Sequence, residues 1–232
     1  MAQGAEAGEL ISTGYQGAVY KSPAGGAVPQ DEWPESGYII IKEAHGVGIA
    51  RFFRRAMIRR EYRVYQRLKH VPGVPRCYGL RDADHLMLEY VDSESLRAAD
   101  KSLADHDEFY ARLRDIIREV HAAGVAHNDL KRKNNMLVSA DGRPYLIDFG
   151  TAVFRKPNGG FLNRRLFAIA CQLDLNAWIK HKYRGRFDEV SAADRADYRP
   201  TIVERAFRPM QKFWRRVTAR QWRKARRRRR LR

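Results

Sequence analysis

Two polar groups joined by a short hairpin constrain the fold of this chain more than any other feature. The first group, residues 127–135, reads His-Asn-Asp-Leu-Lys-Arg-Lys-Asn-Asn, and the second is Asp148-Phe149-Gly150. Between them lie two short apolar runs typical of strands, 136–138 and 145–147, and the turn signal Asp141-Gly142. We expect the hairpin to bring both polar groups to one end of a small sheet.

The residue types in these groups suit metal and phosphate chemistry. Asn134 follows Asp129 by five residues, and Asp148 follows Asn134 by fourteen. Mg²⁺ prefers oxygen ligands and keeps several waters, so one carboxylate and one amide are enough protein ligands. The other carboxylate, Asp129, is then free to orient a hydroxyl nucleophile and to accept its proton. The pattern predicts a magnesium site at Asn134 and Asp148.

Positive charge is concentrated in two stretches of the chain. The formal net charge is +18 over 232 residues, but residues 208–232 carry thirteen Arg or Lys without an acid, and residues 51–69 carry eight with one Glu. The rest of the chain is nearly neutral. The basic character therefore indicates one basic helix and one basic tail, and only secondarily a nucleic-acid-binding protein.

Composition also limits the class of protein. An apolar share of 44% is enough for a packed core. The isolated cysteines, Cys77 and Cys171, argue against a zinc site or a disulfide framework and suit a reducing compartment. The polar leader over residues 1–9 lacks the features of a signal peptide, and no apolar run is long enough to span a membrane. These observations predict a cytoplasmic protein.

An acid interrupts the apolar stripe of the basic helix predicted over residues 51–69. The stripe recurs at steps of three and four residues and comprises Phe53, Met57, Glu61, Val64 and Leu68. A glutamate on such a face requires a cationic partner or strong hydrogen bonds. A second helix, which Asp107 is expected to cap, follows before Gly124, and the chain from Phe161 onward is predicted to be mainly helical.

The sequence H-N-D-L-K-x-x-N followed by D-F-G resembles the catalytic loop and the metal-binding motif of protein kinases. The resemblance implies that Asp129 is the catalytic base, that Lys131 faces the transferring phosphoryl group, and that Asn134 and Asp148 bind Mg²⁺. It extends from about Leu10 to Gly150. Among short kinase-like proteins, the chain is similar to Rio-type kinases and to bacterial kinases that phosphorylate sugars of the lipopolysaccharide core.

The resemblance also implies an α+β architecture with two lobes. A small β-rich N-terminal lobe is expected over residues 10–91 and a reduced, mostly helical C-terminal lobe over 92–207, with the leader 1–9 before them and the basic tail 208–232 after them. ATP is expected to bind between the lobes.

Upstream residues match the nucleotide-binding elements of the same family. Ile40-Ile41-Lys42 resembles the strand whose lysine contacts the α- and β-phosphates, and Glu61 would be the ion-pair partner of Lys42. The remaining nucleotide contacts implied by the resemblance are glycine-rich-loop residues Gly14 and Gly17, the adenine neighbour Val19, the gating residue Leu88, and the hinge residues Glu89 and Val91.

The chain departs from typical protein kinases after Gly150. No A-P-E motif follows, and only residues 151–160 precede the next helical stretch. Asn128 occupies a position at which many kinases have an arginine that binds an activating phosphate. Both departures favour a site that is assembled without a phosphorylation switch. Asp174 is expected either to hold the catalytic loop by hydrogen bonds or to be a solvated helix residue.

The sequence therefore predicts a kinase that transfers the γ-phosphoryl group of ATP to an alcohol. Lys131 favours the hydroxyl of a protein Ser or Thr as acceptor. One alternative is a sugar of the lipopolysaccharide core, with the enzyme held at the inner membrane by its basic tail on anionic lipid. An alternative of another class is a catalytically silent module that binds nucleotide or nucleic acid.

Overall fold

The computed structural model describes residues 8–14, 17–25, 28, 33–34 and 36–200. The basic tail 208–232 and most of the leader 1–9, for which sequence analysis made predictions, lie outside the described residues.

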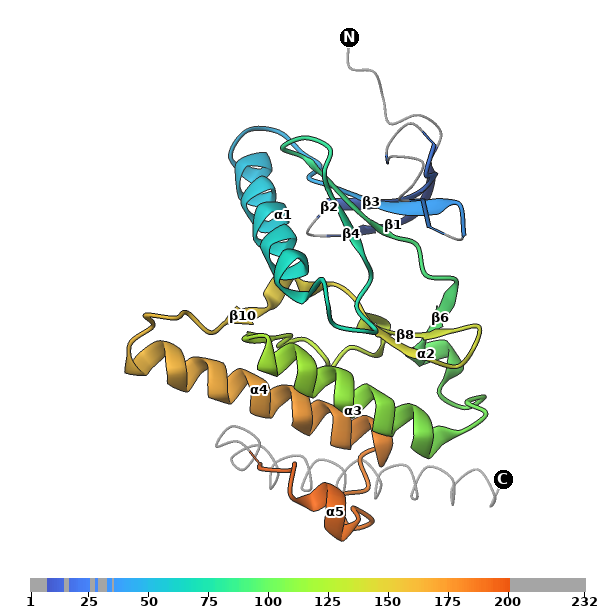
Figure 1. Cartoon of the computed structure of the whole chain (residues 1–232), viewed down its shortest axis with the longest axis vertical. Helices are drawn as coiled ribbons and strands as arrows, with labels where there is room; N and C mark the ends of the chain where they lie inside the picture. Colours follow the sequence, from blue (N-terminus) through green and yellow to red (C-terminus); the bar gives the residue numbers. More distant parts are fainter. Residues whose placement is uncertain (1–7, 15–16, 26–27, 29–32, 35, 201–232) are drawn as a thin grey trace, which may run out of the picture.

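A five-stranded antiparallel sheet forms the upper part of the molecule, with strand order β1-β2-β3-β5-β4 (Figure 1). Its strands are β1 (Glu9–Gly14), β2 (Gly17–Pro23), β3 (Tyr38–Glu43), β4 (Cys77–Leu80) and β5 (His85–Glu89). Successive side chains of a strand point to opposite faces. In β3, Ile39 and Ile41 are therefore buried in one small apolar cluster, while Ile40 and Lys42 face the opposite side.

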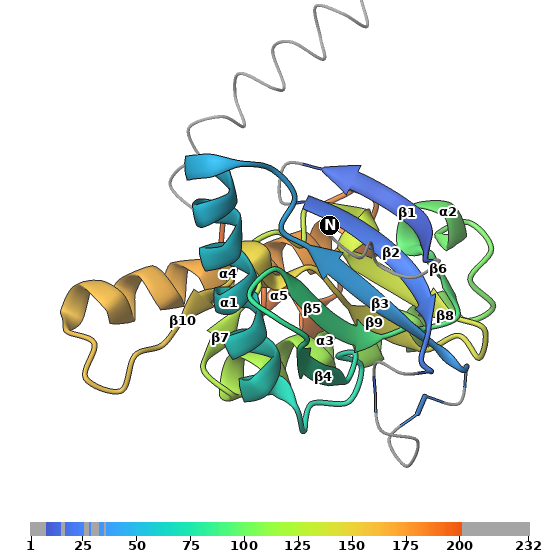
Figure 2. The same ribbon diagram turned by 90° about the horizontal axis from the view of Figure 1, so that it is seen from above.

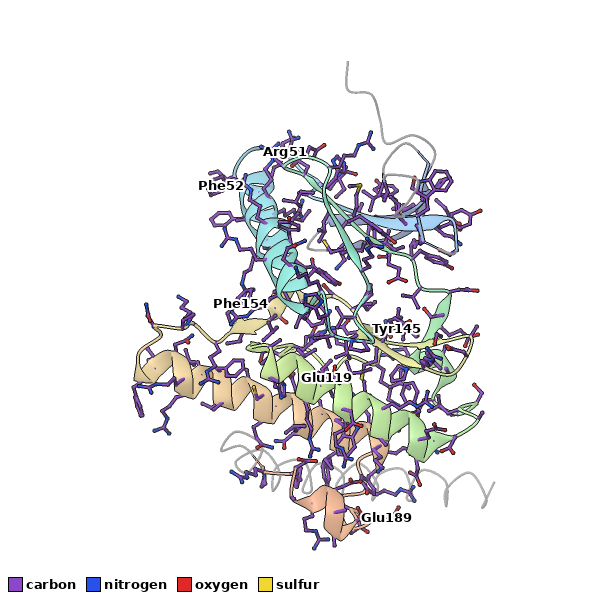
Figure 3. The ribbon with its side chains drawn as sticks, in the orientation of Figure 1. Arg51, Phe52, Glu119, Tyr145, Phe154 and Glu189 are labelled. Atoms are coloured by element: carbon purple, nitrogen blue, oxygen red, sulfur yellow. The ribbon has the colours of Figure 1, made fainter. Side chains whose placement is uncertain are left out.

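Helix α1 (Gly48–Leu68) packs beside this sheet through its C-terminal half. Its buried residues are Ile58, Glu61, Val64, Tyr65 and Leu68. The predicted stripe is therefore correct from Glu61 onward, but Phe53 is 62% exposed. The reason is tertiary, since the buried residues of α1 begin only at Ile58 and no described helix or strand covers its first turns. Figure 3 shows Phe52, the preceding residue, pointing outward from the helix.

The lower part of the molecule is mostly helical. Helix α3 (His106–Ala122) packs along α4 (Phe161–Lys182), and Trp178 of α4 is fully buried and donates a hydrogen bond to the Tyr110 carbonyl, at 2.7 Å. Asp105 caps α3 by accepting from the Glu108 amide, so the expected cap at Asp107 is wrong by two residues. The side-chain oxygen of a cap residue must reach a free amide two or three residues on, and Asp105 is the one that does.

The remaining elements are short, and most of them lie between the sheet and the long helices (Figures 1 and 2), whereas the last of them lies beyond α4, at the bottom of Figure 1. They are β6 (Ser93–Ser95), α2 (Leu96–Ala99), β7 (Val125–Ala126), the 3₁₀ turn η2 (Lys133–Asn135), β8 (Met136–Ser139), β9 (Pro144–Leu146), the 3₁₀ turn η3 (Phe149–Thr151), β10 (Val153–Phe154) and α5 (Ala192–Arg195). Strands β8 and β9 form the predicted hairpin, with β6 on its other edge. The fold is two-lobed and α+β, as the sequence predicts.

Among the described residues, no helix combines the length and the apolar character needed to cross a bilayer.

A buried histidine joins α4 to the polar loop. His181 is 5% exposed, and its Nε2 lies 2.8 Å from the Leu130 carbonyl, so the neutral ring donates this hydrogen bond. Burial lowers the pKa of His181 from 6.5 to about 4, and nearby Lys133 and Lys180 act in the same direction. The native state therefore disfavours protonation of this ring.

We expect the free energy of unfolding to fall as the pH decreases through the window between 6.5 and 4. In that window the unfolded chain binds a proton at His181 that the native state does not, so His181 contributes a loss of about 2 kcal/mol between pH 7 and pH 5. His181→Gln keeps a donor for the Leu130 carbonyl but does not titrate. Urea unfolding at both pH values should show a smaller pH dependence for this variant. The exposed His70, changed to Gln, is the control, and equal pH dependence of all three proteins would contradict the assignment.

Candidate active site

A cavity of about 570 Å³ separates the sheet from the helical body. The predicted site residues that line it are Gly17, Val19, Lys42, Glu61, Leu88, Glu89, Val91, Asp129, Asn134 and Asp148. They come from the sheet, from α1, from the connection after β5 and from the polar loop. Of the remaining two, Gly14 pairs with Gly17 across the β1-β2 hairpin, and Lys131 is exposed and outside the lining.

A larger cavity, about 670 Å³, lies between the β8-β9 turn and the segment that precedes α3. It holds none of the residues predicted for the site, and the two cavities share only Ser93 in their linings. The chemistry of the lining, and not the volume, therefore identifies the smaller cavity as the candidate active site.

The acid on the apolar face of α1 has the cationic partner that its burial requires. Lys42 Nζ lies 2.6 Å from Glu61 Oε1, and Glu61 is 3% exposed. Burial opposes the charge of the ammonium group, but the Glu61 carboxylate outweighs it and the pKa of Lys42 is raised. Asp148 Oδ1, 3.4 Å from the same nitrogen, adds to this effect. Lys42 therefore stays a cation at the polar end of the cavity.

The residue after Asp148 anchors it in the core. Phe149 is fully buried between the rings of Tyr65 and His127, with centroid distances of 5.4 and 4.7 Å. Asp148 itself has a φ of 64°, in the left-handed region, which turns the chain between β9 and η3. His127 also contacts the carbonyl of the preceding Ile147 through Nε2, at 2.9 Å. These contacts leave the Asp148 carboxylate at the edge of the cavity.

Arg60 fastens α1 to the segment that follows Asp148. Its guanidinium donates to the Gly150 carbonyl at 2.8 Å and to the Ala152 carbonyl. Sequence analysis did not identify Arg60, because it is one of several arginines on a basic helix. Its role depends on a segment ninety residues away in the chain.

Asp174 holds the polar loop from α4. Its Oδ2 accepts from the His127 amide at 2.7 Å and its Oδ1 from the Asn128 amide at 2.8 Å, and His121 Nε2 lies 3.0 Å from Oδ2. The side chain of Asp174 is 1% exposed. Of the two expectations for this residue, the structural anchor is confirmed.

Asn135, and not its neighbour, is the amide that contacts Asp129. Asn135 Nδ2 donates to the main-chain carbonyl of Asp129 at 3.1 Å and to its Oδ2 at 3.2 Å, and Asn135 is 5% exposed. Asn134 also lines the cavity, but it is exposed and its Oδ1 accepts from Arg97 Nε at 2.9 Å. The two donors of Asn135 are directed to Asp129, which leaves its oxygen for another partner.

The same shift by one residue affects the basic side chains of the loop. Arg132 lines the cavity with its Nε 3.4 Å from Asp129 Oδ2, whereas Lys131, one residue earlier, is exposed and outside the lining. The 3₁₀ turn η2, which the Asn135 amide closes onto the Arg132 carbonyl at 3.0 Å, produces this register. The sequence did not reveal it, because the motif spacing of five residues after Asp129 points to Asn134 and does not predict the turn.

The wall of the cavity around Gly17 has no space for a side chain. Gly17 has a φ of 144°, and a Cβ at this position would lie 1.9 Å from the Glu43 carbonyl. Apolar side chains from both lobes cover the rest of the slot, namely Val19 and Ile40 above and Leu137 and Ile147 below. Ile40, Leu137 and Ile147 were not among the predicted site residues, although Leu137 and Ile147 lie in the predicted hairpin strands 136–138 and 145–147.

Comparisons with known proteins agree with this geometry. The model of the RIO domain family matches residues 46–166, more than half of the chain. Calcium-dependent protein kinase 12 of Oryza sativa subsp. japonica is 36% identical over 107 residues, which cover 42% of this chain and 20% of that protein. A probable serine/threonine-protein kinase of Dictyostelium discoideum, fnkB, is 28% identical over 109 residues, 43% of this chain and 20% of that protein.

A longer match is to a protein that is not named as a protein kinase. A probable bifunctional tRNA threonylcarbamoyladenosine biosynthesis protein of Methanosarcina barkeri is 28% identical over 155 residues, 64% of this chain and 25% of that protein. The chain thus spans about a fifth to a quarter of the length of these relatives. With its two-lobed kinase-like fold and a family match over more than half of its length, the chain belongs to the RIO domain family.

Proposed function

We propose that the protein is an ATP-dependent phosphotransferase that transfers the γ-phosphoryl group to a hydroxyl acceptor. The observation that carries the proposal is the convergence of Lys42, Glu61, Asp129 and Asp148 on one cavity between the lobes. In sequence these residues are up to 106 positions apart, as the contact between Lys42 and Asp148 illustrates. Apolar residues at these positions would stabilise the fold at least as well. The convergence of these charged groups therefore indicates a functional site.

The apolar part of the cavity suits an adenine base. Val19, Ile40, Leu137 and Ile147 provide two apolar walls. At the outer edge, the hinge residues Glu89–Val91 line the cavity. The Glu89 amide already donates to the Arg76 carbonyl and the Val91 carbonyl accepts from Ser93, so we propose that other main-chain groups of the hinge bond to the base. The slot ends at Leu88, whose side chain is 3% exposed.

The polar end of the cavity suits the phosphates. Lys42 is held in the charged form by Glu61, so that it can neutralise phosphate oxygens without a change of protonation. Gly17 at the hairpin end, together with Gly14 on the paired strand, belongs to the segment that we propose covers the phosphates.

The donor set around Asp148 fits Mg²⁺. The cavity offers the Asp148 carboxylate and the oxygen of an amide, which are the oxygen ligands that Mg²⁺ prefers. We propose Asp148 and Asn135 as the residues that hold the cation, in place of the pair Asp148 and Asn134 expected from the sequence. A bound Mg²⁺ neutralises charge on the phosphates during transfer.

Asp129 is positioned to act as the base. An acceptor hydroxyl whose oxygen attacks the γ-phosphorus gives its proton to the Asp129 carboxylate, while the bond from this phosphorus to the bridging oxygen breaks and ADP leaves with that oxygen. The amide of Asn135 and the guanidinium of Arg132 orient the Asp129 carboxylate. We propose that Arg132 faces the transferring group in addition to Lys131, or in its place.

For the acceptor we propose a protein Ser or Thr. The support is the D-x-K sequence at Asp129–Lys131 and the similarity to protein kinases, one of which is a probable serine/threonine-protein kinase. A sugar of the lipopolysaccharide core remains the alternative acceptor, and incubation of the protein with labelled ATP and either cell protein or lipopolysaccharide distinguishes the two. We propose a cytoplasmic location for either reaction.

Changing each acid separately tests the division of roles at the site. Asp129→Asn should lower kcat by about a hundredfold or more, because the base is lost, and leave the dissociation constant of Mg²⁺·ATP within about threefold. Asp148→Ala should raise that constant about tenfold or more, because a metal ligand is lost. Labelled-phosphate transfer and equilibrium binding of a fluorescent ATP analogue provide the two measurements.

The exposed Asp141 of the β8-β9 turn is the matched control, and Asp141→Asn should change neither quantity. Equal loss of nucleotide binding in Asp129→Asn and Asp148→Ala would contradict the division of roles. Absence of transfer to any acceptor, water included, by the unchanged protein would instead support the silent nucleotide-binding module.

The two neighbouring asparagines provide a second test. If Asn135 holds the cation, Asn135→Ala should raise the Mg²⁺ concentration for half-maximal activity about tenfold or more, whereas Asn134→Ala should change it less than about threefold. Activity is titrated with MgCl₂ at saturating ATP, and thermal unfolding checks that each variant is folded. The reverse order of the two effects would restore Asn134 as the ligand.

The buried ion pair is tested by a double-mutant cycle. Lys42→Met and Glu61→Gln should each lower kcat/KM about tenfold or more, since either change leaves the other group without its partner. The double variant should be little worse than the more damaging single variant. Multiplicative losses in kcat/KM would show that the two residues act independently.

A further inference from the structure

Exposed apolar side chains are concentrated at the starts of two helices. Eight of the thirteen large apolar residues exposed in the described part of the chain belong to the starts of α1 and α4, namely Val47, Ile49, Phe52, Phe53, Phe161, Leu162, Leu166 and Ile169. In Figure 1 the start of α1 lies at the upper left of the molecule and the start of α4 at the far left of its lower part, so they are two separate clusters on the left side of that view. We use the name apolar-basic face for these eight residues together with the arginines that lie among them in the sequence, Arg51, Arg164 and Arg165.

The first half of α4 projects from the body, and no element of the described residues covers it. None of its residues before Ala170 is buried. The orientation of this half is fixed by Asn163, which donates to the Phe154 carbonyl at 3.1 Å and accepts from the Lys156 amide at 2.9 Å. Leu162, Leu166 and Ile169 recur at steps of four and three, and so lie along one side of the helix with exposures of 70, 52 and 49%.

The start of α1 has the same character. Phe52 and Phe53 are 69 and 62% exposed and contact each other edge to face, with ring centroids 5.9 Å apart. Val47 and Ile49 immediately before them are 86 and 77% exposed. Apolar residues that served only the core of this protein would be buried. Their exposure therefore indicates a surface that binds another molecule.

The charge around both helix starts is of one sign. Between Asp148 and Asp174 the chain contains four basic residues, Arg155, Lys156, Arg164 and Arg165, and no acid. Between Glu43 and Glu61 it contains five arginines and no acid. One acid from elsewhere, Asp84, pairs with Arg51 and Arg55, which leaves a net positive charge beside the four apolar residues.

We propose that the apolar-basic face binds the surface of an anionic lipid bilayer. Arginines contact the phosphate headgroups, while the Leu, Ile and Phe side chains enter the boundary between headgroups and acyl chains. A nucleic acid would use the arginines but would leave eight apolar side chains in water. The absence of a membrane-spanning helix among the described residues agrees with attachment at the surface. The proposal does not depend on the phosphotransferase reaction.

Vesicle flotation of the full chain at two salt concentrations tests the proposal. At about 0.1 M NaCl we expect the chain to bind vesicles of phosphatidylcholine with about 30% phosphatidylglycerol more tightly than vesicles of phosphatidylcholine alone, because headgroup charge draws the arginines to the surface. In about 0.5 M NaCl the contribution of the basic tail is screened, while apolar insertion persists. The double variants Leu162→Ser/Ile169→Ser and Phe52→Ser/Phe53→Ser should then each lower the vesicle-bound fraction about tenfold.

Leu10→Ser is the matched control, since Leu10 is also an exposed leucine, at 53%, but lies in β1, outside this face. Its vesicle binding should equal that of the unchanged chain, and thermal unfolding should be the same for all four proteins. Unchanged binding of the two double variants, or no binding of the unchanged chain at high salt, would overturn the proposal. The proposal would also be overturned if the two double variants kept their lipid binding but no longer formed a dimer or no longer bound RNA.

Discussion

The ion pair between Lys42 and Glu61 is the interaction on which the candidate site depends. Removing both charges from water carries a large cost, which their 2.6 Å contact offsets only in this one geometry. The pair therefore fixes α1 against β3, and with it the position of every α1 residue that reaches the cavity. Asp148, 3.4 Å from the same ammonium group, is drawn to the same point by charge. A pair of apolar residues would stabilise the lobe equally well, but it would place no cation at the polar end of the cavity to attract Asp148 or phosphate oxygens.

Adjacent residues of α1 connect the ion pair to the lower lobe. Side chains of consecutive helical residues point about 100° apart, so Glu61 faces the sheet while Arg60 reaches the carbonyls of Gly150 and Ala152. A displacement of α1 would break both contacts together. From below, Asp174 holds the amides of His127 and Asn128. Asp148 is thus positioned from α1 and Asp129 from α4. The two sets of contacts meet at Phe149, which packs against Tyr65 of α1 and His127 of the polar loop.

Features with a local signature were predictable from the sequence, and features that depend on tertiary register were not. Glu61 was identified because an acid on an apolar face requires a partner, and the hairpin because its strands flank an Asp-Gly turn. The motif spacing points to Asn134, whereas a single 3₁₀ turn, which the motif does not predict, brings Asn135 into contact with Asp129. Phe53 was expected to be buried because its helical period matches the stripe, but the period cannot indicate where the neighbouring sheet ends. Arg60 was hidden among seven other basic residues of the same stretch.

The segment after Asp148 is short and is held by contacts that need no added phosphate. Thr151 donates to the His127 carbonyl at 3.3 Å, β10 pairs with β7, and α4 begins at Phe161. The described residues between Asp148 and α4 therefore include no long loop whose ordering could act as a switch. The first half of α4 follows this segment directly. In the proposed lipid-binding role, the bilayer would hold α4 and, through it, the end of the segment that begins at Asp148.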